Sequence, residues 1–547
     1  MREMKMRKPI LKTEWFLSPI VVLMLFMATA RAATPGITGP TFNLTAQPAY
    51  LNQPDGAMVY SWGYGCNGAP TGFAPAAITN ATCPSMQVPG PTLIVTEGQT
   101  VTVNLTNNLP TAVGNTSILF PGFQVSTTGG VTGLLAQEAA PGGTVTYSFV
   151  ASSPGTRSYY SGTQSDLQIE MGLFGAIIVL PTQATIPSNC ISGLATTNLS
   201  AEARWGEKDF RLAPAAYSHS KACYDREYLF QFSEMDPAIH HQALEQVAAA
   251  NCTPVGGALP ATCSLHVATE PYHPAYFMIN GRSMPDDMDA NYTNLYPHQP
   301  YNGNPHMHPG EQVLIRVIGQ GRWQHPFHEH GNHVRILARD GNLITSTTNP
   351  AANLAGPLLF TTTTTPGLAF DGIFYWTGKG LNWDPYGHHA ALPAPANPNS
   401  ITASVTANDE LPCVPDANGY NTLGTSYTQI NYYEWCQDHN KPLEAMPFGD
   451  VAGGGPATLP DPNIFTNGAW FGGSAYLGKD ATLRAVGPNG VTPPSGTLAN
   501  PPSTEAGYAF MWHSHNEREI TTNNAFPGGM LMMMLVDSRE FVIDESN

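Results

Sequence analysis

The chain contains one succession of short apolar segments twice, and this repeat limits the possible folds more than any other feature. The first copy opens with VPGPTLIVTEGQTVTVNLTNNLP (88–110) and closes with MGLFGAIIVLP (171–181). The second copy opens with HPGEQVLIRVIGQG (308–321) and closes with PGGMLMMMLVD (527–537). Apolar and polar residues alternate with a period of two between Pro-Gly turns, which predicts antiparallel strands in two β-sandwiches.

The composition supports the same fold class. The 547 residues include 53 glycines and 49 prolines, and only 12% of them are charged. Such a chain is rich in turns and poor in helix-forming residues, so we expect an all-β protein. The net charge of −17 excludes the positive surface that nucleic-acid binding requires.

The repeat divides the chain into three parts after its N-terminal segment. We expect a first sandwich over 33–182, a middle segment over 183–269 and a second sandwich over 270–547. The middle segment includes a predicted strand, REYLFQFSEMD (226–236), and a predicted helix, HHQALEQVAAA (240–250). The second copy is interrupted by an insertion at about 378–506, to which the sequence assigns no role.

The first 32 residues are typical of an export signal. Arg2 to Lys12 form a basic start, Phe16 to Met27 are apolar, and Ala30-Arg31-Ala32 matches a cleavage site. The apolar stretch is too short to span a bilayer comfortably, although a retained membrane anchor is the alternative interpretation. We expect the mature protein in the periplasm, on the cell surface or in the medium.

The eight cysteines fit an exported protein. An even number of cysteines in such a chain predicts disulfides, and we expect each cysteine to pair with its sequence neighbour. The expected pairs are Cys66–Cys83, Cys190–Cys223, Cys252–Cys263 and Cys413–Cys436.

The histidines are distributed very unevenly. All seventeen lie at or beyond His219, and two clusters stand out, HPFHEHGNH (325–333) and MWHSHNE (511–517). Each cluster contains a His-x-His step, and side chains two residues apart on a strand share one face. Two such strands side by side would bring four imidazoles together, which suits copper, with zinc as an alternative.

These segments resemble those of the multicopper oxidases, a family of tandem cupredoxin β-sandwiches. The resemblance is carried by both copies and above all by the His-Pro-x-His-x-His-Gly string and its partner WHSH. It implies that four histidines match ligands of a trinuclear copper cluster, namely His328, His330, His513 and His515. It also implies that His325 and Met530 match ligands of a mononuclear (type 1) copper.

The chain departs from the family pattern at several ligands. Ser514 lies where the family has the cysteine of the mononuclear copper, and no histidine lies between His515 and Met530. A serine hydroxyl cannot replace a soft thiolate in electron transfer. In the first copy, ILFPGFQV (118–125) and SYYSGTQ (158–164) lie where two His-x-His pairs are expected. The usual reduction of oxygen is therefore expected to be impaired in this chain.

Each candidate ligand also has a structural interpretation. The four cluster histidines could form a hydrogen-bonded network without a metal. His325 with Met530 is more easily explained as filling the fold, and His333 as a packed histidine. His306 and His308 lie close enough to supplement the site, but loop histidines are common. Met530, Met532 and Met534 share a strand face, where they fill a core more often than they bind Cu(I).

Three functions remain open at this point. The first is a copper-dependent oxidoreductase that oxidises a small donor or a metal ion with oxygen, acting as a homo-oligomer or with a partner chain that completes the site. The second is a copper-binding or carrier protein without turnover. The third is an extracellular scaffold built from degenerate cupredoxin domains.

Overall fold

The computed structural model describes most of both predicted sandwiches. The described residues are 33–190, 208–376, 473–477, 498–499, 507–537, 543 and 545. The predicted export signal, most of the insertion and the predicted Cys413–Cys436 pair lie outside them. The all-β prediction is confirmed, because strands dominate the described chain and only short helices accompany them.

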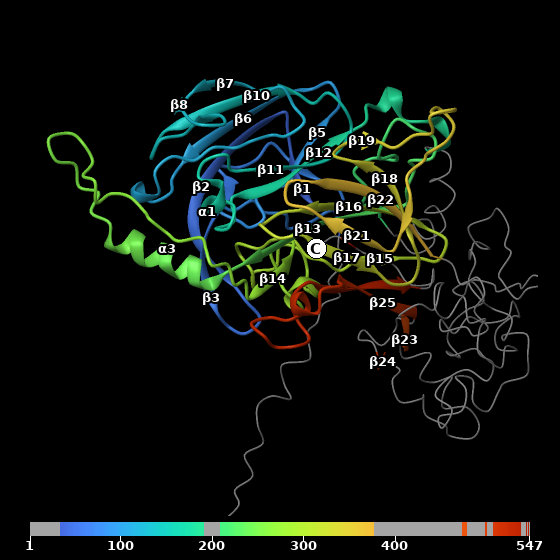
Figure 1. Ribbon diagram of the computed structural model, residues 1–547. Coiled ribbons are helices and arrows are strands. Elements are labelled where there is room, and N and C mark those ends of the chain that lie inside the picture. Colours follow the sequence, from blue (N-terminus) through green and yellow to red (C-terminus); the bar gives the residue numbers. More distant parts are fainter. Residues whose placement is uncertain are drawn as a thin grey trace, which may run out of the picture.

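The first sandwich consists of two five-stranded sheets (Figure 1). One sheet has the order β11 (Gly155–Tyr160), β12 (Phe174–Leu180), β5 (Leu93–Thr96), β1 (Gly36–Thr38) and β4 (Phe73–Ala74). The other has the order β3 (Met58–Cys66), β2 (Thr41–Asn52), β6 (Thr100–Asn107), β10 (Thr144–Val150) and β7 (Ser126–Gly129). A small hairpin of β8 (Val131–Thr132) and β9 (Gln137–Glu138) lies beside them.

The strands β5 and β6 show how the sequence pattern builds this sandwich. Alternate apolar residues of β6 are fully buried, whereas the residues between them are partly exposed. The turn between the two strands contains Gly98 with a φ of +84°, a conformation that suits glycine. The turn carries the chain from one sheet to the other, so the two strands face each other across the core.

The second sandwich has two seven-stranded sheets. The inner sheet contains β14 (Tyr276–Ile279), β13 (Arg226–Met235), β16 (Gln312–Gly319), β22 (Ala369–Tyr375), β18 (Val334–Arg339) and β19 (Asn342–Leu343), with β20 (Leu358–Leu359) beside β18. The outer sheet contains β15 (His306–Met307), β26 (Leu531–Asp537), β25 (Gly507–Ser514), β17 (His325–Glu329) and β21 (Thr361–Thr364), with β23 (Gly473–Leu477) and β24 (Leu498–Ala499) at one edge.

The core of the second sandwich is aromatic and rich in methionine. Phe230, Phe327 and Trp512 meet edge to face between the two sheets. Met530, Met532 and Met534 are fully buried in the same cluster. The methionines of this strand therefore fill the core, as the simpler interpretation of their pattern predicted.

The middle segment belongs to both sandwiches. The predicted strand is β13, which lies inside the inner sheet between β14 and β16. The predicted helix is α3 (Pro237–Ala249), which begins after the N-cap Asp236. Its buried residues Ile239 and Ala243 pack on the core of the first sandwich. A second short helix, α1 (Ser165–Gln168), precedes β12.

The inner sheet of the second sandwich faces the first sandwich, with β11 against β16 and β22 (Figure 1). At this interface Thr156 donates a hydrogen bond to Asp371 at 2.6 Å, and Tyr217 donates another to the same carboxylate. Arg316 binds Glu227 at 2.9 Å and lies 3.7 Å from Asp371. The outer sheet, which carries both histidine clusters, is therefore the layer farthest from the first sandwich.

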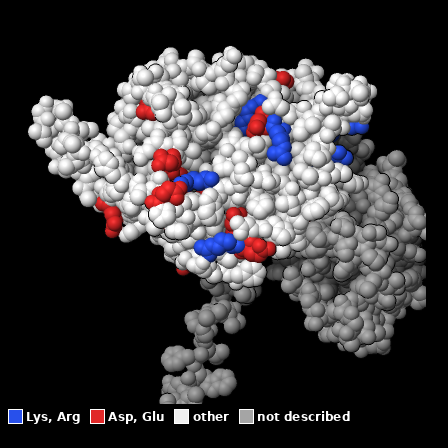
Figure 2. Space-filling model, in the orientation of Figure 1, with Lys and Arg blue, Asp and Glu red and all other residues white. Residues whose placement is uncertain are grey.

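Three of the predicted disulfides are present, Cys66–Cys83, Cys190–Cys223 and Cys252–Cys263. The visible surface carries few charges, and most lysines and arginines there lie beside acidic residues (Figure 2). Within the described chain, no helix has the length and apolar character needed to cross a bilayer.

Candidate metal centre

The two histidine clusters lie on neighbouring strands of the outer sheet. Strands β17 and β25 are antiparallel, and His328 is directly opposite His513 in their register. The core residue Phe327 points into the sandwich, so the alternating side chains of His328 and His330 point away from it. The predicted convergence of the two clusters is therefore present in the fold.

The strand ends help to form the cluster. Strand β17 ends at Glu329 and β25 ends at Ser514, so His330 and His515 each lie one residue beyond a strand. Gly331 follows with a φ of +97°, and a Cβ atom there would meet the ring of Phe510 at 3.0 Å. The chain can therefore turn tightly after His330.

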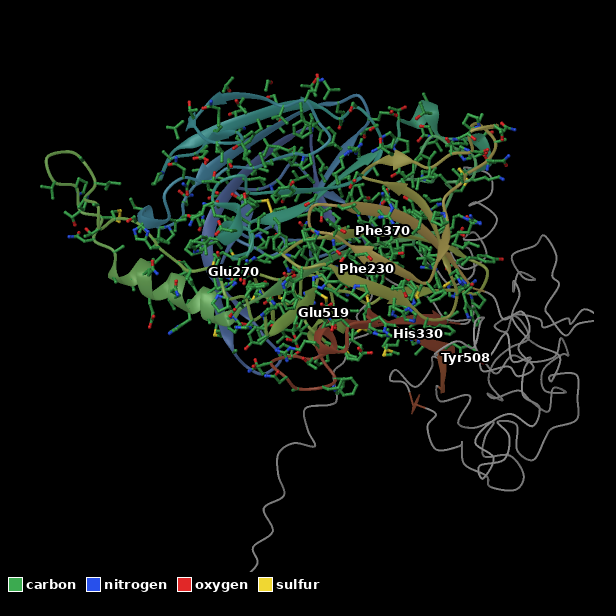
Figure 3. The ribbon with its side chains drawn as sticks, in the orientation of Figure 1. Phe230, Glu270, His330, Phe370, Tyr508 and Glu519 are labelled. Atoms are coloured by element: carbon green, nitrogen blue, oxygen red, sulfur yellow. A yellow bond between two sulfur atoms is a disulfide. The ribbon has the colours of Figure 1, made fainter. Side chains whose placement is uncertain are left out.

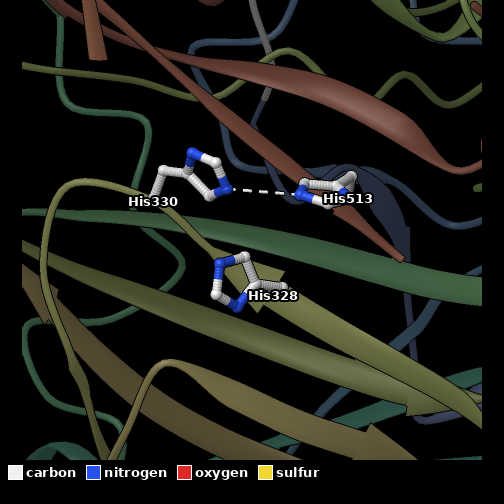
Figure 4. A group of neighbouring side chains, drawn as sticks. All are labelled: His328, His330 and His513. Carbon is white, nitrogen blue, oxygen red and sulfur yellow. Dashed lines mark hydrogen bonds between the residues drawn. The ribbon is translucent and has the colours of Figure 1, made fainter. Parts of the chain in front are cut away.

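The four imidazoles lie close together. The ring centre of His328 lies 4.8 Å from that of His330, 5.5 Å from that of His513 and 4.7 Å from that of His515. Ring nitrogens of His328, His330 and His513 all lie within 4.8 Å of one another (Figure 4). His515 is adjacent, but 52% of its side chain is exposed, and it is outside this group of three.

The separation of two ring nitrogens fits a single ion. Nε2 of His330 and Nε2 of His513 are 3.2 Å apart. Two nitrogens bound at about 2.0 Å to one tetrahedral ion would lie about 3.3 Å apart. The rings therefore need little movement to hold copper or zinc, and the donor set of neutral imidazoles suits both metals.

Hydrogen bonds fix the orientation of two of these rings. Nδ1 of His513 lies 2.7 Å from the carbonyl oxygen of Ser514, which can only accept, so this nitrogen carries the proton. Its Nε2 then has a lone pair directed at the cluster. Nδ1 of His328 is 2.6 Å from the hydroxyl of Thr361. Such partners behind the ring are typical of metal-binding histidines.

The cluster favours uncharged imidazoles. Burial, followed by the neighbouring His330, His513 and His515, lowers the pKa of His328 from 6.5 to about 4. Burial also lowers the pKa of His513. At neutral pH these rings therefore have lone pairs, which is the form that binds a metal ion.

A different arrangement occupies the position expected for the mononuclear copper. His325 lies between two carboxylates, with Nε2 2.9 Å from Glu234 and Nδ1 2.8 Å from Glu519. Ser514 donates its hydroxyl proton to Glu519 at 2.5 Å. Met530 is buried beside them, and its backbone N–H donates to the carbonyl of Glu519. This donor set does not fit a type 1 copper, because it has no thiolate and both nitrogens of its imidazole are occupied.

The first sandwich has a network of hydroxyl and amide groups where the resemblance expected its histidine pairs. Ser161 donates to the side-chain oxygen of Gln168 at 2.6 Å, and Thr163 donates to Glu138 at 2.8 Å. The hydroxyl of Ser117 lies 2.8 Å from that of Thr163. Neutral hydroxyls of this kind are poor ligands for copper.

The weaker candidates lie apart from the cluster. His306 and His308 are buried, contrary to the expectation of loop residues. Nδ1 of His306 lies 2.8 Å from the carboxylate of Asp537, and Nδ1 of His308 lies 3.0 Å from its backbone carbonyl oxygen. His306 pairs with Leu535 on β26, whereas His513 pairs with Leu531 on the same strand. His333 packs its ring edge on Phe360. These three are outside the group of ligand atoms within the described residues.

Sequence reasoning missed three residues near these sites. Glu234 and Glu519 had no role assigned, although a carboxylate inside an apolar strand such as β13 signals a buried partner. The third residue is Glu329, which lies between His328 and His330 in the sequence. It is fully buried, and its carboxylate has no hydrogen-bond partner within the described chain, so burial raises its pKa far above the usual range.

Comparisons with known proteins agree with the motifs and the fold. Family models described as multicopper oxidase match residues 76–184 and 268–369. Multicopper oxidase MCE of Talaromyces pinophilus is 34% identical over 122 residues, 22% of this chain and 19% of that protein. Laccase abr2 of Aspergillus fumigatus is 35% identical over 98 residues, 17% of this chain and 16% of that protein.

The chain thus matches less than a fifth of the length of these two relatives. The solved blue copper oxidase from Nitrosomonas europaea is 14% identical, with a TM-score of 0.40, over 90% of this chain and 85% of that chain. The two regions matched by the family models each cover part of one cupredoxin-type sandwich. The second region includes His325, His328 and His330. Residues 76–184 and 268–369 therefore carry multicopper oxidase domains.

Proposed function

We propose that this protein binds copper through His328, His330 and His513, with His515 as a fourth ligand. The observation that carries the proposal is the convergence of ring nitrogens on one point, with the Nε2 atoms of His330 and His513 3.2 Å apart. The lowered pKa of His328 supports it, because neutral imidazoles are the metal-binding form. Thr361 and the carbonyl of Ser514 would orient the rings.

Copper held by imidazoles would supply one-electron chemistry toward small donors, metal ions and oxygen. Because His515 is half exposed, water or a substrate would have access to an ion held by these histidines. We therefore assign the coarse function of a copper-dependent oxidoreductase, as the family implies. No particular donor is favoured by the described residues.

We propose further that oxidase turnover in this chain is weak. The family passes electrons through a copper bound by a thiolate, whereas Ser514 and the carboxylate-bound His325 occupy that position here. The same observation favours a second candidate, a copper-binding protein that carries or stores the ion without turnover. Oxygen consumption distinguishes the two candidates.

We propose that the protein is exported and that a second chain completes the copper site. The basic and apolar N-terminal segment and the disulfides support export. The cluster lies on the sheet farthest from the first sandwich of its own chain, which supports completion by a neighbour. A neighbouring copy could not add histidines from its first sandwich, because the first 218 residues contain none.

Metal quantification tests the copper site directly. The full-length protein, expressed with ample copper and purified, is compared with a His328→Ala/His513→Ala variant. We expect bound copper in the wild type and almost none in the variant. A matched control, His241→Ala/His266→Ala, removes two exposed histidines and should retain the wild-type copper content. Equal copper in all three proteins would refute the site, and zinc in place of copper would correct the metal.

Oxygen uptake with phenolic donors and with reduced metal ions then separates the two functions. An oxidoreductase consumes oxygen in proportion to the donor, and the double variant does not. A carrier binds copper with no such uptake. Size-exclusion chromatography with light scattering, with and without copper, tests whether a second copy joins the site.

A further inference from the structure

We propose that Glu234, His325, Glu519 and Ser514 form a metal-free clamp that stands in place of a mononuclear copper and fixes the two histidine-bearing strands against each other. The proposal deepens the proposed function, because the clamp would position the copper ligands. Its tests can nevertheless be read without copper. The clamp assigns roles to Glu234 and Glu519, for which the sequence motifs give none.

Glu519 is the centre of the clamp. It lies in the short 3-10 turn η6 (Glu517–Ile520), which follows β25, and is fully buried. Its Oε2 accepts from His325 at the start of β17 and from Ser514 at the end of β25. Its Oε1 accepts from the side-chain amide of Asn516 at 2.9 Å. One carboxylate therefore binds both strands and the turn that follows His515. Figure 3 shows where Glu519 lies in the second sandwich.

Glu234 holds the other side of His325. Its Oε2 accepts from Nε2 of His325, and its Oε1 accepts from the backbone N–H groups of Arg322 and Trp323. These two residues precede β17, so Glu234 fixes the entry to that strand from β13. Tyr272 lies 3.2 Å from Glu234 and donates to Glu170 of the first sandwich at 2.7 Å.

The clamp is more than a packed histidine, because its two hydrogen bonds to carboxylates require a proton on each ring nitrogen. Carboxylates can only accept, so both nitrogens of His325 donate and the ring is an imidazolium. The two carboxylates raise its pKa to about 9 in spite of the burial. A protonated ring has no lone pair for a metal ion.

The clamp adds to a short pairing of the two strands. Their register covers three residue pairs, namely Phe327 with Ser514, His328 with His513, and Glu329 with Trp512, and one further backbone hydrogen bond lies at each end of it. Copper at His328 and His513 would hold this register only once it is bound. Here the imidazolium and its two carboxylates bind the same strand ends through charged hydrogen bonds.

Nuclear magnetic resonance of the full-length protein labelled with ¹⁵N at histidine tests the clamp. Assignment uses a His325→Gln variant. At neutral pH, His325 should show a proton on both ring nitrogens in the metal-free protein, and both should stay protonated when diamagnetic Cu(I) is added. A single protonated ring nitrogen, before or after Cu(I) is added, would overturn the metal-free clamp.

Hydrogen–deuterium exchange of the metal-free protein tests the positioning role. Glu519→Gln keeps the shape of the side chain but removes its charge, and exchange in peptides covering β17 and β25 should rise by roughly tenfold. The matched control is Glu227→Gln, which weakens the buried pair with Arg316 at the sandwich interface. We expect the control to leave exchange in β17 and β25 unchanged.

Two results would overturn the positioning role. One is unchanged exchange in Glu519→Gln, and the other is an equal rise in both variants, which would indicate a general loss of stability. Failure of the proposed function is a separate result, because wild-type protein without bound copper would still give both the ¹⁵N signals and the exchange rates.

Discussion

His325 and His328 lie three residues apart on one strand, yet their environments are opposite. His325 points into the sandwich between two carboxylates, and its pKa rises to about 9. His328 points away from the core among three other imidazoles, and its pKa falls to about 4. The same side chain is therefore a buried cation at one position and a neutral candidate ligand at the other.

The difference teaches that burial alone does not decide the state of a histidine. Burial lowers the pKa of both rings and is the largest single influence on each. Glu234 and Glu519 together outweigh it at His325, whereas the neighbouring histidines add to it at His328. A histidine motif therefore cannot be assigned to a metal without knowing what lies on each side of every ring.

The largest expected effect comes from removing the charged ring. His325→Ala leaves two buried carboxylates without their cation, and we expect it to lower the free energy of unfolding by about 3–5 kcal/mol. His328→Ala removes a buried but neutral ring from a cluster of imidazoles and should cost about 1–2 kcal/mol in the metal-free protein. Urea unfolding measures both free energies, and equal losses in the two variants would contradict the different roles of His325 and His328.

Alkaline pH should weaken the clamp. The pKa of His325 is higher in the folded chain than in the unfolded chain, so its contribution to stability is complete below about 6.5 and is lost as the pH rises through about 9. The free energy of unfolding of the wild type should therefore fall over this window. Subtracting the curve of His325→Gln isolates the effect, and parallel curves would contradict it.

Acidic pH should act on the other histidines with the opposite sign. The pKa of His328 is lower in the folded chain, so its contribution is complete above about 6.5 and is lost as the pH falls toward about 4. The free energy of unfolding should decrease less steeply over this window in His328→Ala than in the wild type. Carboxylates titrate in both proteins, so only the difference between the curves is informative.

The smallest expected effect concerns the hydrogen bond behind His328. Thr361→Val removes the hydroxyl that lies 2.6 Å from Nδ1 and should weaken copper binding by about tenfold. Thr363→Val changes an exposed residue on the same strand and serves as the control. Competition with a chelator of known affinity gives both dissociation constants, and identical values would show that Thr361 does not orient the ring.

Local sequence patterns were sufficient for much of the fold. Period-two alternation located strands such as β6, and the His-x-His steps identified the two strands that meet in the outer sheet. Neighbour pairing of the cysteines was correct for the three described disulfides. These features depend on residues that are close in sequence or on one strand.

The partners of His325 could not be predicted in this way. Glu234 and Glu519 are 91 and 194 residues away from it in sequence, and only the packing of β13 and η6 brings them together. The burial of His306 likewise depends on the pairing of β15 with β26. Glu329 lies between two candidate ligands in the sequence, but it points into the core and is fully buried.

The outward direction of the histidine pairs has a practical consequence for assembly. Since His328 and His513 are buried and 52% of the His515 side chain is exposed, we expect an ion to enter the cluster beside His515. The protein can therefore fold first and be reconstituted with metal afterwards. We expect a mild chelator to strip the ion and added copper to restore it, with no intervening denaturation.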